Sequence, residues 1–164
     1  MWKMLNDMKR EPEMIIMMGL PASGKNTWLM NKNVKQHIVV ELDWIRREIF
    51  GHQFHKPAEM FVIGMAKNIT QMLLSQQKSI IINSTGLTTG IRNEWALMAQ
   101  EYGYKTKIVF IDTPVEMCHK RNNNRIHYKV PSEVIDRMSA ILTRPDNNLM
   151  IGCDLADKIV VVKS

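Results

Sequence analysis

The amino-acid sequence predicts an α/β fold in which a parallel β-sheet is covered by helices on both faces. Two observations support this prediction. Short apolar runs alternate along the chain with longer stretches of helical periodicity, which is the order expected when strands and helices take turns. The apolar runs are apolar at almost every position, as in parallel strands that are buried on both faces. The length of 164 residues suits one domain with its own hydrophobic core.

The first expected strand, the turn after it and the start of a helix lie between Met14 and Trp28. Gly19 and Gly24 bracket four residues, so the backbone N–H groups between them can turn inward at the N-terminus of the helix. Lys25 adds a positive charge that reaches the outer phosphates of a nucleotide. This pattern predicts a phosphate-binding loop, with a simple Gly-Pro turn as the alternative.

The rest of the chain continues the alternation. Apolar and β-branched runs predict further strands at residues 37–42, 79–82, 106–112 and 157–162. Amphipathic periodicity and capping signals predict helices at residues 27–33, 44–50, 57–77, 88–102, 116–120 and 131–141. Gly51 and Gly103 are expected to end the second and fourth of these helices. Between Arg121 and Lys129 the sequence is basic and the apolar periodicity lapses.

The residues at the carboxyl ends of the strands are the candidates for chemistry, because ligands of open α/β sheets bind outside these ends. The expected edge residues are Gly19–Lys25, Asp43, Asn83–Leu87 and Asp112. Asp43 follows the second strand region directly, and Arg46 shares its face if a helix begins there. The alternative is that Asp43 only caps this helix and that Arg46 is solvated.

Arg121 and Arg125 are four residues apart, so a helical turn would align both guanidinium groups over the same spot. In that arrangement they would clamp a transferring phosphate and neutralise the charge on its oxygens. The alternative is a basic, solvated helix end that the helix dipole favours.

The composition limits the class of protein. The formal net charge of +6 favours polyanionic partners and leaves nucleic acids and small phosphates as equal candidates. Cys118 and Cys153 lie far apart without a Cys/His cluster, which predicts a reducing compartment and no structural zinc. Residues 1–13 are charged, and no apolar run approaches the ~20 residues that span a bilayer. We therefore expect a cytoplasmic protein without membrane contact, with residues 1–13 as a flexible segment and residues 14–164 as the domain.

Four stretches together resemble the kinase domain of the polynucleotide 5′-hydroxyl kinase family, within the P-loop kinases related to adenylate kinase. They are Gly19–Lys25, Asp43–Arg46, Asn83–Leu87 and the segment that runs from Asp112 through Arg121 and Arg125 to Pro131. The resemblance spans residues 14–162. It implies a P-loop kinase with a basic helical lid, which binds ATP or another nucleoside triphosphate together with Mg²⁺.

The resemblance also implies a reaction and the roles of two residues. The γ-phosphate of ATP would pass to the 5′-hydroxyl end of RNA or DNA, a step that prepares broken ends for ligation. By position, Asp43 would activate the 5′-hydroxyl, and Arg46 would hold the phosphate on the 3′ side of the terminal nucleotide. Phosphoryl transfer requires positioning and charge neutralisation, with one carboxylate that accepts the hydroxyl proton, so the chemistry agrees with these roles.

The residues of the expected site fall into three overlapping groups. The candidate catalytic residues are Lys25, Asp43 and Arg125. The candidate acceptor-binding residues are Asp43, Arg46 and Thr85. The candidate donor-binding residues are Gly19, Leu20, Pro21, Ala22, Ser23, Gly24, Lys25, Asn26, Thr27, Arg121 and Arg125.

Two positions depart from the family pattern, and both remove groups that help to hold a metal ion. Asn26 replaces the Ser or Thr hydroxyl that normally binds Mg²⁺ after the loop lysine. Asn83-Ser84 stands where relatives carry an acidic residue. Because an amide oxygen is a hard ligand, Asn26 is still expected to act as a weak magnesium ligand, directly or through water.

Two other functions fit the same residues. One is a P-loop kinase for a small hydroxyl acceptor such as a nucleoside or an antibiotic. The other is a catalytically impaired module that binds nucleotide or RNA, which Asn26, Asn83 and the basic charge favour. No phosphatase motif accompanies the kinase pattern, so only a kinase domain is expected, and the sequence leaves the oligomeric state open.

Overall fold

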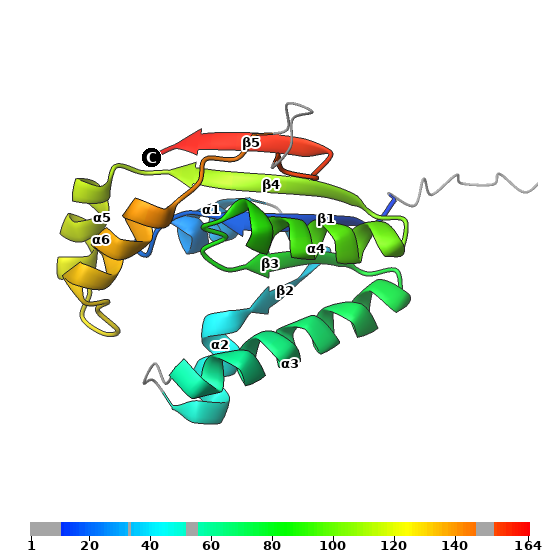
Figure 1. The fold of residues 1–164 in the computed structure, drawn as a ribbon, viewed down its shortest axis with the longest axis horizontal. Coiled ribbons are helices and arrows are strands. Elements are labelled where there is room, and N and C mark those ends of the chain that lie inside the picture. The colour runs from blue at the N-terminus through cyan, green and yellow to red at the C-terminus, as the bar shows by residue number, and fades with distance from the viewer. Residues whose placement is uncertain (1–10, 33, 52–55, 147–152) are drawn as a thin grey trace, which may run out of the picture.

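A computed structural model describes residues 11–32, 34–51, 56–146 and 153–164. Its five strands form one parallel sheet in the order β2-β3-β1-β4-β5 (Figure 1). The strands are β1 (Glu13–Met18), β2 (His37–Glu41), β3 (Ser79–Asn83), β4 (Lys105–Asp112) and β5 (Lys158–Lys163). The first strand begins at Glu13, and residues 1–10 of the expected flexible segment lie outside the described residues.

Helices follow the strands as the sequence predicts. They are α1 (Lys25–Asn31), α2 (Leu42–Phe50), α3 (Lys56–Ser75), α4 (Thr89–Glu101), α5 (Val115–Asn123) and α6 (Ser132–Ile141). Thr88 caps α4, because its hydroxyl oxygen accepts a hydrogen bond from the Ile91 N–H at 3.3 Å. Gly51 follows the last residue of α2 with a φ of 70°, a conformation that favours glycine. Within the described residues, no helix has both the length and the apolar character needed to cross a membrane.

The core lies on both faces of the central strand β1. Met14, Ile16 and Met18 are buried on one face, where residues of α3 and α4 cover them. Ile15 and Met17 are buried on the other face, where Trp28 and Leu29 of α1 pack. Because alternate side chains of one strand enter different clusters, the strand is apolar at successive positions, as the sequence indicates.

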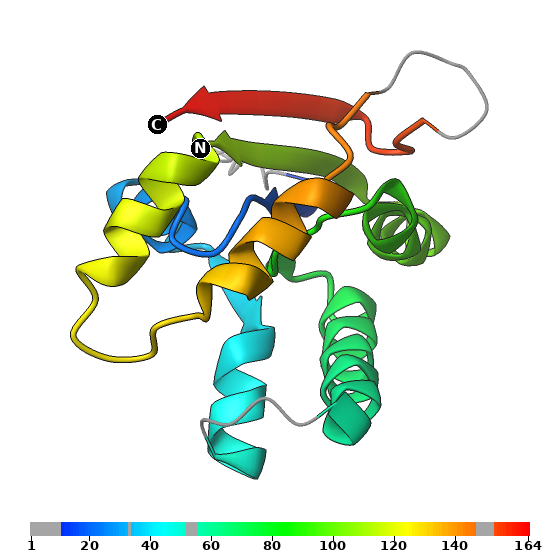
Figure 2. The same cartoon turned by 60° about the vertical axis from the view of Figure 1, so that its left-hand side comes forward.

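The prediction of a buried second strand is wrong for β2. This strand lies at one edge of the sheet, and Ile38 and Val39 are 41% and 40% exposed. Val40 is buried against β3 and the helices on one face. The local sequence is as apolar as that of a central strand, but strand order is a tertiary property that an apolar run does not encode. Figure 2 shows α2 and α3 side by side below this edge.

All strands point the same way, so their carboxyl ends meet at one edge of the sheet, beside α5 and α6 (Figure 1). A hydrogen bond from the Gly19 N–H to the Thr85 carbonyl, at 3.0 Å, joins the segments after β1 and β3. Gly86 lies in the same segment and has a φ of 53°, a conformation that favours glycine. A Cβ at this position would also lie only 2.9 Å from the Met17 carbonyl oxygen. The predicted edge residues are thus gathered into one region.

Candidate phosphotransfer site

The loop between β1 and α1 has the backbone conformation of an anion-binding turn. Ala22 and Gly24 have φ angles of 62° and 105°, and Gly24 is the N-cap of α1. Within the described residues, no side chain caps α1, so the N–H groups of its first turn are available to an anion. A side chain at Gly19 would not fit, because a Cβ there would lie 2.6 Å from Ser23 Oγ.

Lys25 lies over this loop. Its Nζ donates hydrogen bonds to the carbonyl oxygens of Gly19 and Leu20 at 2.8 and 2.9 Å. Burial lowers the pKa of Lys25 to about 8, the nearby negative charge of Asp43 opposes this shift, and the positive charge of Arg125 adds to it. The structure therefore brings Lys25, Asp43 and Arg125, the three expected catalytic residues, into one electrostatic neighbourhood.

Asp43 and Arg46 share one face of α2, as expected if a helix begins after β2. Arg46 Nη1 donates to Asp43 Oδ1, and the Asp43 side chain is 82% exposed. The alternative that Asp43 caps the helix is wrong, because the N-cap is Glu41 and Asp43 lies within the first turn. The exposed carboxylate is thus available to a substrate hydroxyl.

Sequence reasoning missed the second partner of Arg46. Glu59, in the first turn of α3, accepts hydrogen bonds from Arg46 Nε and Nη2 at 2.7 and 2.9 Å. These bonds raise the pKa of Arg46, burial lowers it, and the charge of Asp43 raises it further. The only signal in the sequence is a carboxylate one turn into a long amphipathic helix, which is too common to indicate a contact.

Arg121 and Arg125 reach the loop in different ways. Arg121 Nη1 donates to the Ser23 carbonyl at 3.0 Å and to Ser164 Oγ at 3.1 Å, so it braces the outer wall of the loop. Arg125 lies beyond α5, which ends at Asn123, and its charge acts on Lys25. The two residues therefore do not share a helical turn, because the Asn-rich sequence ends the helix between them.

Asn26 and Asn83 are in direct contact where β3 ends and α1 begins. Asn83 Nδ2 donates to Asn26 Oδ1 at 3.0 Å, and the Asn26 side chain lies near the carboxylate of Glu41. Burial and the charge of Asp43 raise the pKa of Glu41, whereas Arg47 and the nearby Asn26 amide lower it. Sequence reasoning missed Glu41, although a carboxylate at the last position of an apolar strand was a visible signal.

These side chains offer hard oxygen ligands, the kind that Mg²⁺ prefers. Within the described residues, no group of three or more His, Cys, Asp or Glu side chains forms a ready metal site. A magnesium ion at this site would therefore depend on nucleotide phosphates and water for most of its ligands, as Mg²⁺ commonly does.

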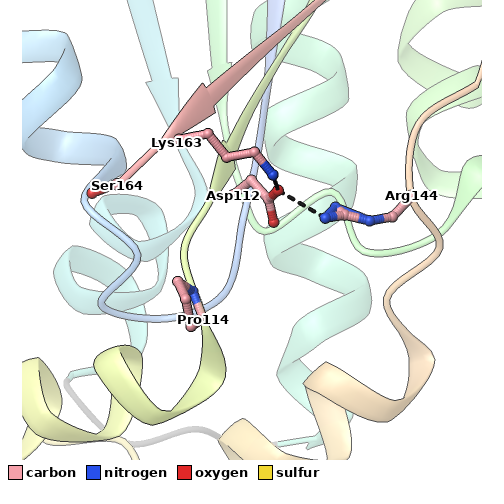
Figure 3. Close-up of a pocket in the computed structure, with 5 residues that line it drawn as sticks. All are labelled: Asp112, Pro114, Arg144, Lys163 and Ser164. Atoms are coloured by element: carbon pink, nitrogen blue, oxygen red, sulfur yellow. Dashed lines mark hydrogen bonds and ion pairs between the residues drawn. The ribbon is translucent and has the colours of Figure 1, made fainter.

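A cavity of about 630 Å³ opens beside the loop at the carboxyl ends of β4 and β5 (Figure 3). Its lining residues are Asp112, Pro114, Arg144, Lys163 and Ser164. Asp112 Oδ2 accepts from Arg144 Nη2 at 2.7 Å and from Lys163 Nζ at 2.5 Å, so the carboxylate expected at this edge is neutralised by two cations. Arg121 links this cavity to the loop through Ser164.

The remaining candidate residues differ in burial and in the atoms that they contribute to the site. Leu20 is buried with Leu87, Cys118 and Ile135, so it contributes only its backbone to the loop. Thr85 contributes its carbonyl oxygen to Gly19. Pro21 is half-buried in the loop, and Thr27 is exposed in the first turn of α1.

Similar folds occur in several kinases of known structure. A chain of the Pnkp1/Rnl/Hen1 RNA repair complex has 22% sequence identity and a TM-score of 0.71 over 84% of this chain. The protein spans 46% of the length of that chain. APS kinase CysC from Mycobacterium tuberculosis, solved with AMPPNP and APS, has 17% identity and a TM-score of 0.62, with 92% of this chain and 88% of that chain covered.

A putative kinase from Chloroflexus aurantiacus has 14% identity and a TM-score of 0.71, with 94% of this chain and 89% of that chain covered. At these identities the likeness concerns the fold, and it confirms the predicted parallel sheet with helices on both faces. The model of the AAA domain family matches residues 14–145, which include the loop, Asp43, Arg121 and Arg125. The chain therefore belongs to the AAA domain family and has the fold of a P-loop kinase.

Proposed function

We propose that the protein is an ATP-dependent kinase that phosphorylates the 5′-hydroxyl ends of RNA or DNA. The observation that carries this proposal is the position of Asp43. Its exposed carboxylate lies at the carboxyl edge of the sheet, contacts Arg46 and acts electrostatically on Lys25. The Asp43 carboxylate thus interacts both with Lys25, which would bind the donor phosphates, and with Arg46, which would bind a phosphate of the acceptor.

The donor fits the loop by its chemistry. Backbone N–H groups at the start of α1 and the Lys25 ammonium would hold the phosphates, and Arg125 would neutralise charge on the transferred group. Mg²⁺ bound with the nucleotide would supply further charge neutralisation, and Asn26 lies where it would meet that ion. The cavity lined by Ser164 would hold the nucleoside of the donor. It lies beside the phosphate-binding loop, since Arg121 contacts both the loop and Ser164.

The acceptor fits Asp43 and Arg46 together. Asp43 would accept the proton of the attacking hydroxyl, and Arg46 would bind the phosphate on the 3′ side of the same nucleotide. The net charge of +6 favours a polyanionic substrate. The similarity in fold to a chain of an RNA repair complex is compatible with nucleic acid ends as the acceptor.

A second candidate function is a kinase for a small hydroxyl acceptor. The observation that favours it is the ion pair between Arg46 and Glu59, which occupies the arginine that a nucleic acid phosphate would need. Structures of a Janibacter sugar kinase and of APS kinase are similar in fold over more than nine-tenths of this chain. Those proteins show that the same architecture occurs in kinases whose names specify small acceptors.

Competition between acceptors tests the proposal. The protein would be incubated with γ-labelled ATP, Mg²⁺ and a 5′-hydroxyl oligonucleotide, with the 5′-phosphorylated oligonucleotide as the matched control. We expect label on the 5′-hydroxyl oligonucleotide alone, undiminished by an excess of nucleosides or sugars. Label on a small acceptor, displaced by neither oligonucleotide, would favour the second candidate. ATP binding without transfer to any acceptor would favour a non-catalytic binding module.

A further inference from the structure

A carboxylate lies beside the end of β3, on the neighbouring strand β2. Glu41 is the last residue of β2, and it is the direct partner of Asn83 in the parallel pairing of β2 with β3. Side chains of paired residues in adjacent strands lie on the same face, about 5 Å apart. The Glu41 carboxylate thus lies one strand away from Asn83, at the same edge of the sheet.

The contacts of Glu41 link it to the loop. Asn26 follows Lys25, its amide oxygen accepts a hydrogen bond from Asn83 at 3.0 Å, and its side chain lies near the Glu41 carboxylate and lowers the pKa of that group. The charge of Asp43 acts on both Glu41 and Lys25, which places all of these groups in one neighbourhood. Glu41 is therefore a carboxylate beside the Asn83–Asn26 pair, next to the residue that follows the loop lysine.

A structural role for this carboxylate is not supported by its contacts. Glu41 is at the N-cap position of α2, yet its side chain accepts no capping hydrogen bond. Among the residues that the structure describes, it takes part in no ion pair, although Arg47 attracts it at longer range. A half-buried carboxylate that has no ion-pair partner among these residues is costly to keep unless another charge joins it.

We propose that Glu41 provides the carboxylate that holds the magnesium–water shell of the bound nucleotide, in place of an acidic residue at position 83. Carboxylates bind Mg²⁺ or its ordered waters well, whereas the neutral amides of Asn26 and Asn83 supply oxygen ligands without charge. In this arrangement Asn26 and Asn83 orient the carboxylate, and Glu41 supplies the negative charge. The inference rests on the nucleotide-binding part of the proposed function and is independent of the acceptor.

Manganese binding measured without an acceptor tests this role. Mn²⁺ would be titrated by electron paramagnetic resonance into the protein bound to a non-hydrolysable ATP analogue. We expect Glu41→Gln to weaken Mn²⁺ binding by about 10–100-fold, as loss of an outer-shell partner typically does. Binding of the analogue in EDTA should stay unchanged, because the loop and Lys25 hold the phosphates.

Two further variants make the result specific. Glu48→Gln on α2 removes an exposed carboxylate that pairs with Arg47, and it should leave Mn²⁺ binding unchanged. Glu41→Gln combined with Asn83→Asp returns a carboxylate to the neighbouring strand and should recover most of the lost affinity.

Mn²⁺ affinity within twofold of wild type in Glu41→Gln, or no recovery in the double variant, would overturn the inference. A wild-type protein that binds no nucleotide would overturn it together with the proposed function. A protein that shows the Glu41 effect yet transfers no phosphate to 5′-hydroxyl ends would contradict only the proposed acceptor.

Discussion

Arg46 and Glu59 form a two-point ion pair that joins α2 to α3, with Nε–Oε1 and Nη2–Oε2 distances of 2.7 and 2.9 Å. The side chains are only 20% and 22% exposed. The remaining nitrogen, Nη1, donates to Asp43. All three nitrogens of the guanidinium therefore face carboxylates, so an acceptor phosphate that binds Arg46, as we propose, would have to share it with Glu59.

Replacement of Glu59 by Gln should strengthen acceptor binding. The change removes a negative charge beside Arg46 but keeps a hydrogen-bond acceptor, so the KM for an acceptor with a 3′-side phosphate should fall about threefold or more. The free energy of unfolding should fall by about 1 kcal/mol, since the pair is neither fully exposed nor fully buried. Steady-state kinetics and urea denaturation measure the two effects.

Glu48→Gln is the matched control, because Glu48 is an exposed carboxylate on α2 that pairs only with Arg47 among the described residues. It should change neither KM nor stability measurably. A KM that rises in Glu59→Gln would show that Glu59 positions Arg46 for the acceptor instead of competing with it.

Asp43→Asn should reduce turnover by about 10²–10⁴-fold and leave ATP affinity almost unchanged. The amide keeps the shape of the side chain but cannot accept the hydroxyl proton. Single-turnover kinetics and equilibrium binding of a fluorescent ATP analogue separate the two effects. Loss of ATP binding with normal turnover at saturating ATP would assign Asp43 to the donor instead of the acceptor.

Nucleotide affinity should fall as the pH rises above about 8. Burial lowers the pKa of Lys25 to about 8 in the free protein, and bound phosphates favour the charged lysine and raise that pKa again. Binding above about pH 8 therefore takes up a proton, and the affinity decreases by up to about tenfold per pH unit until the pKa of the complex is reached.

Calorimetry in two buffers of different ionisation enthalpy measures this proton uptake directly. It should approach one proton at about pH 9 and be small at about pH 7. Lys25→Met should bind nucleotide more weakly and without this pH dependence. A wild-type affinity that is constant across this range would contradict the proposal that the Lys25 ammonium binds the phosphates.

Arg92 and Asp154 form a buried ion pair that fixes the segment after β3. Their side chains are 0% and 1% exposed, and Arg92 Nη1 also donates to the Gly86 carbonyl at 2.8 Å. Arg92→Met should cost about 3–5 kcal/mol in unfolding free energy, because it leaves the Asp154 charge buried and unpaired. Arg92→Met with Asp154→Leu should cost less than the sum of the single changes. Additive losses in urea denaturation would contradict strong coupling between the two residues.

The sequence predicts the parts of the site that depend on local pattern. The loop glycines, Lys25, Asp43 and Arg46 follow from spacing along a strand, a turn and a helix, and the structure places them where these spacings indicate. The local sequence pattern did not predict that α5 ends at Asn123, before Arg125. The end of a helix depends on weak residue preferences, and several neighbouring Asn residues here are equally suited to end it.

The rest of the site depends on contacts between distant segments. Arg46 meets Glu59 from another helix, and Asn26 meets Asn83 across 57 positions of sequence. The position of Glu41 beside Asn83 requires that β2 pairs with β3, which an apolar run does not reveal. These contacts change the interpretation of the site. Glu59 would compete with an acceptor phosphate for Arg46, and Glu41 would supply the carboxylate that we propose for the metal.

The central claim is that this P-loop kinase phosphorylates 5′-hydroxyl ends, and the position of the transferred label tests it most directly. An oligonucleotide with a 5′-hydroxyl would be incubated with the protein and γ-labelled ATP, and then digested to nucleoside 5′-monophosphates, with Asp43→Asn as the control. We predict that all label is recovered in the 5′-monophosphate of the first nucleotide and that the control yields almost none. Label that stays in ATP, or appears in any other nucleotide of the oligonucleotide, would contradict the claim.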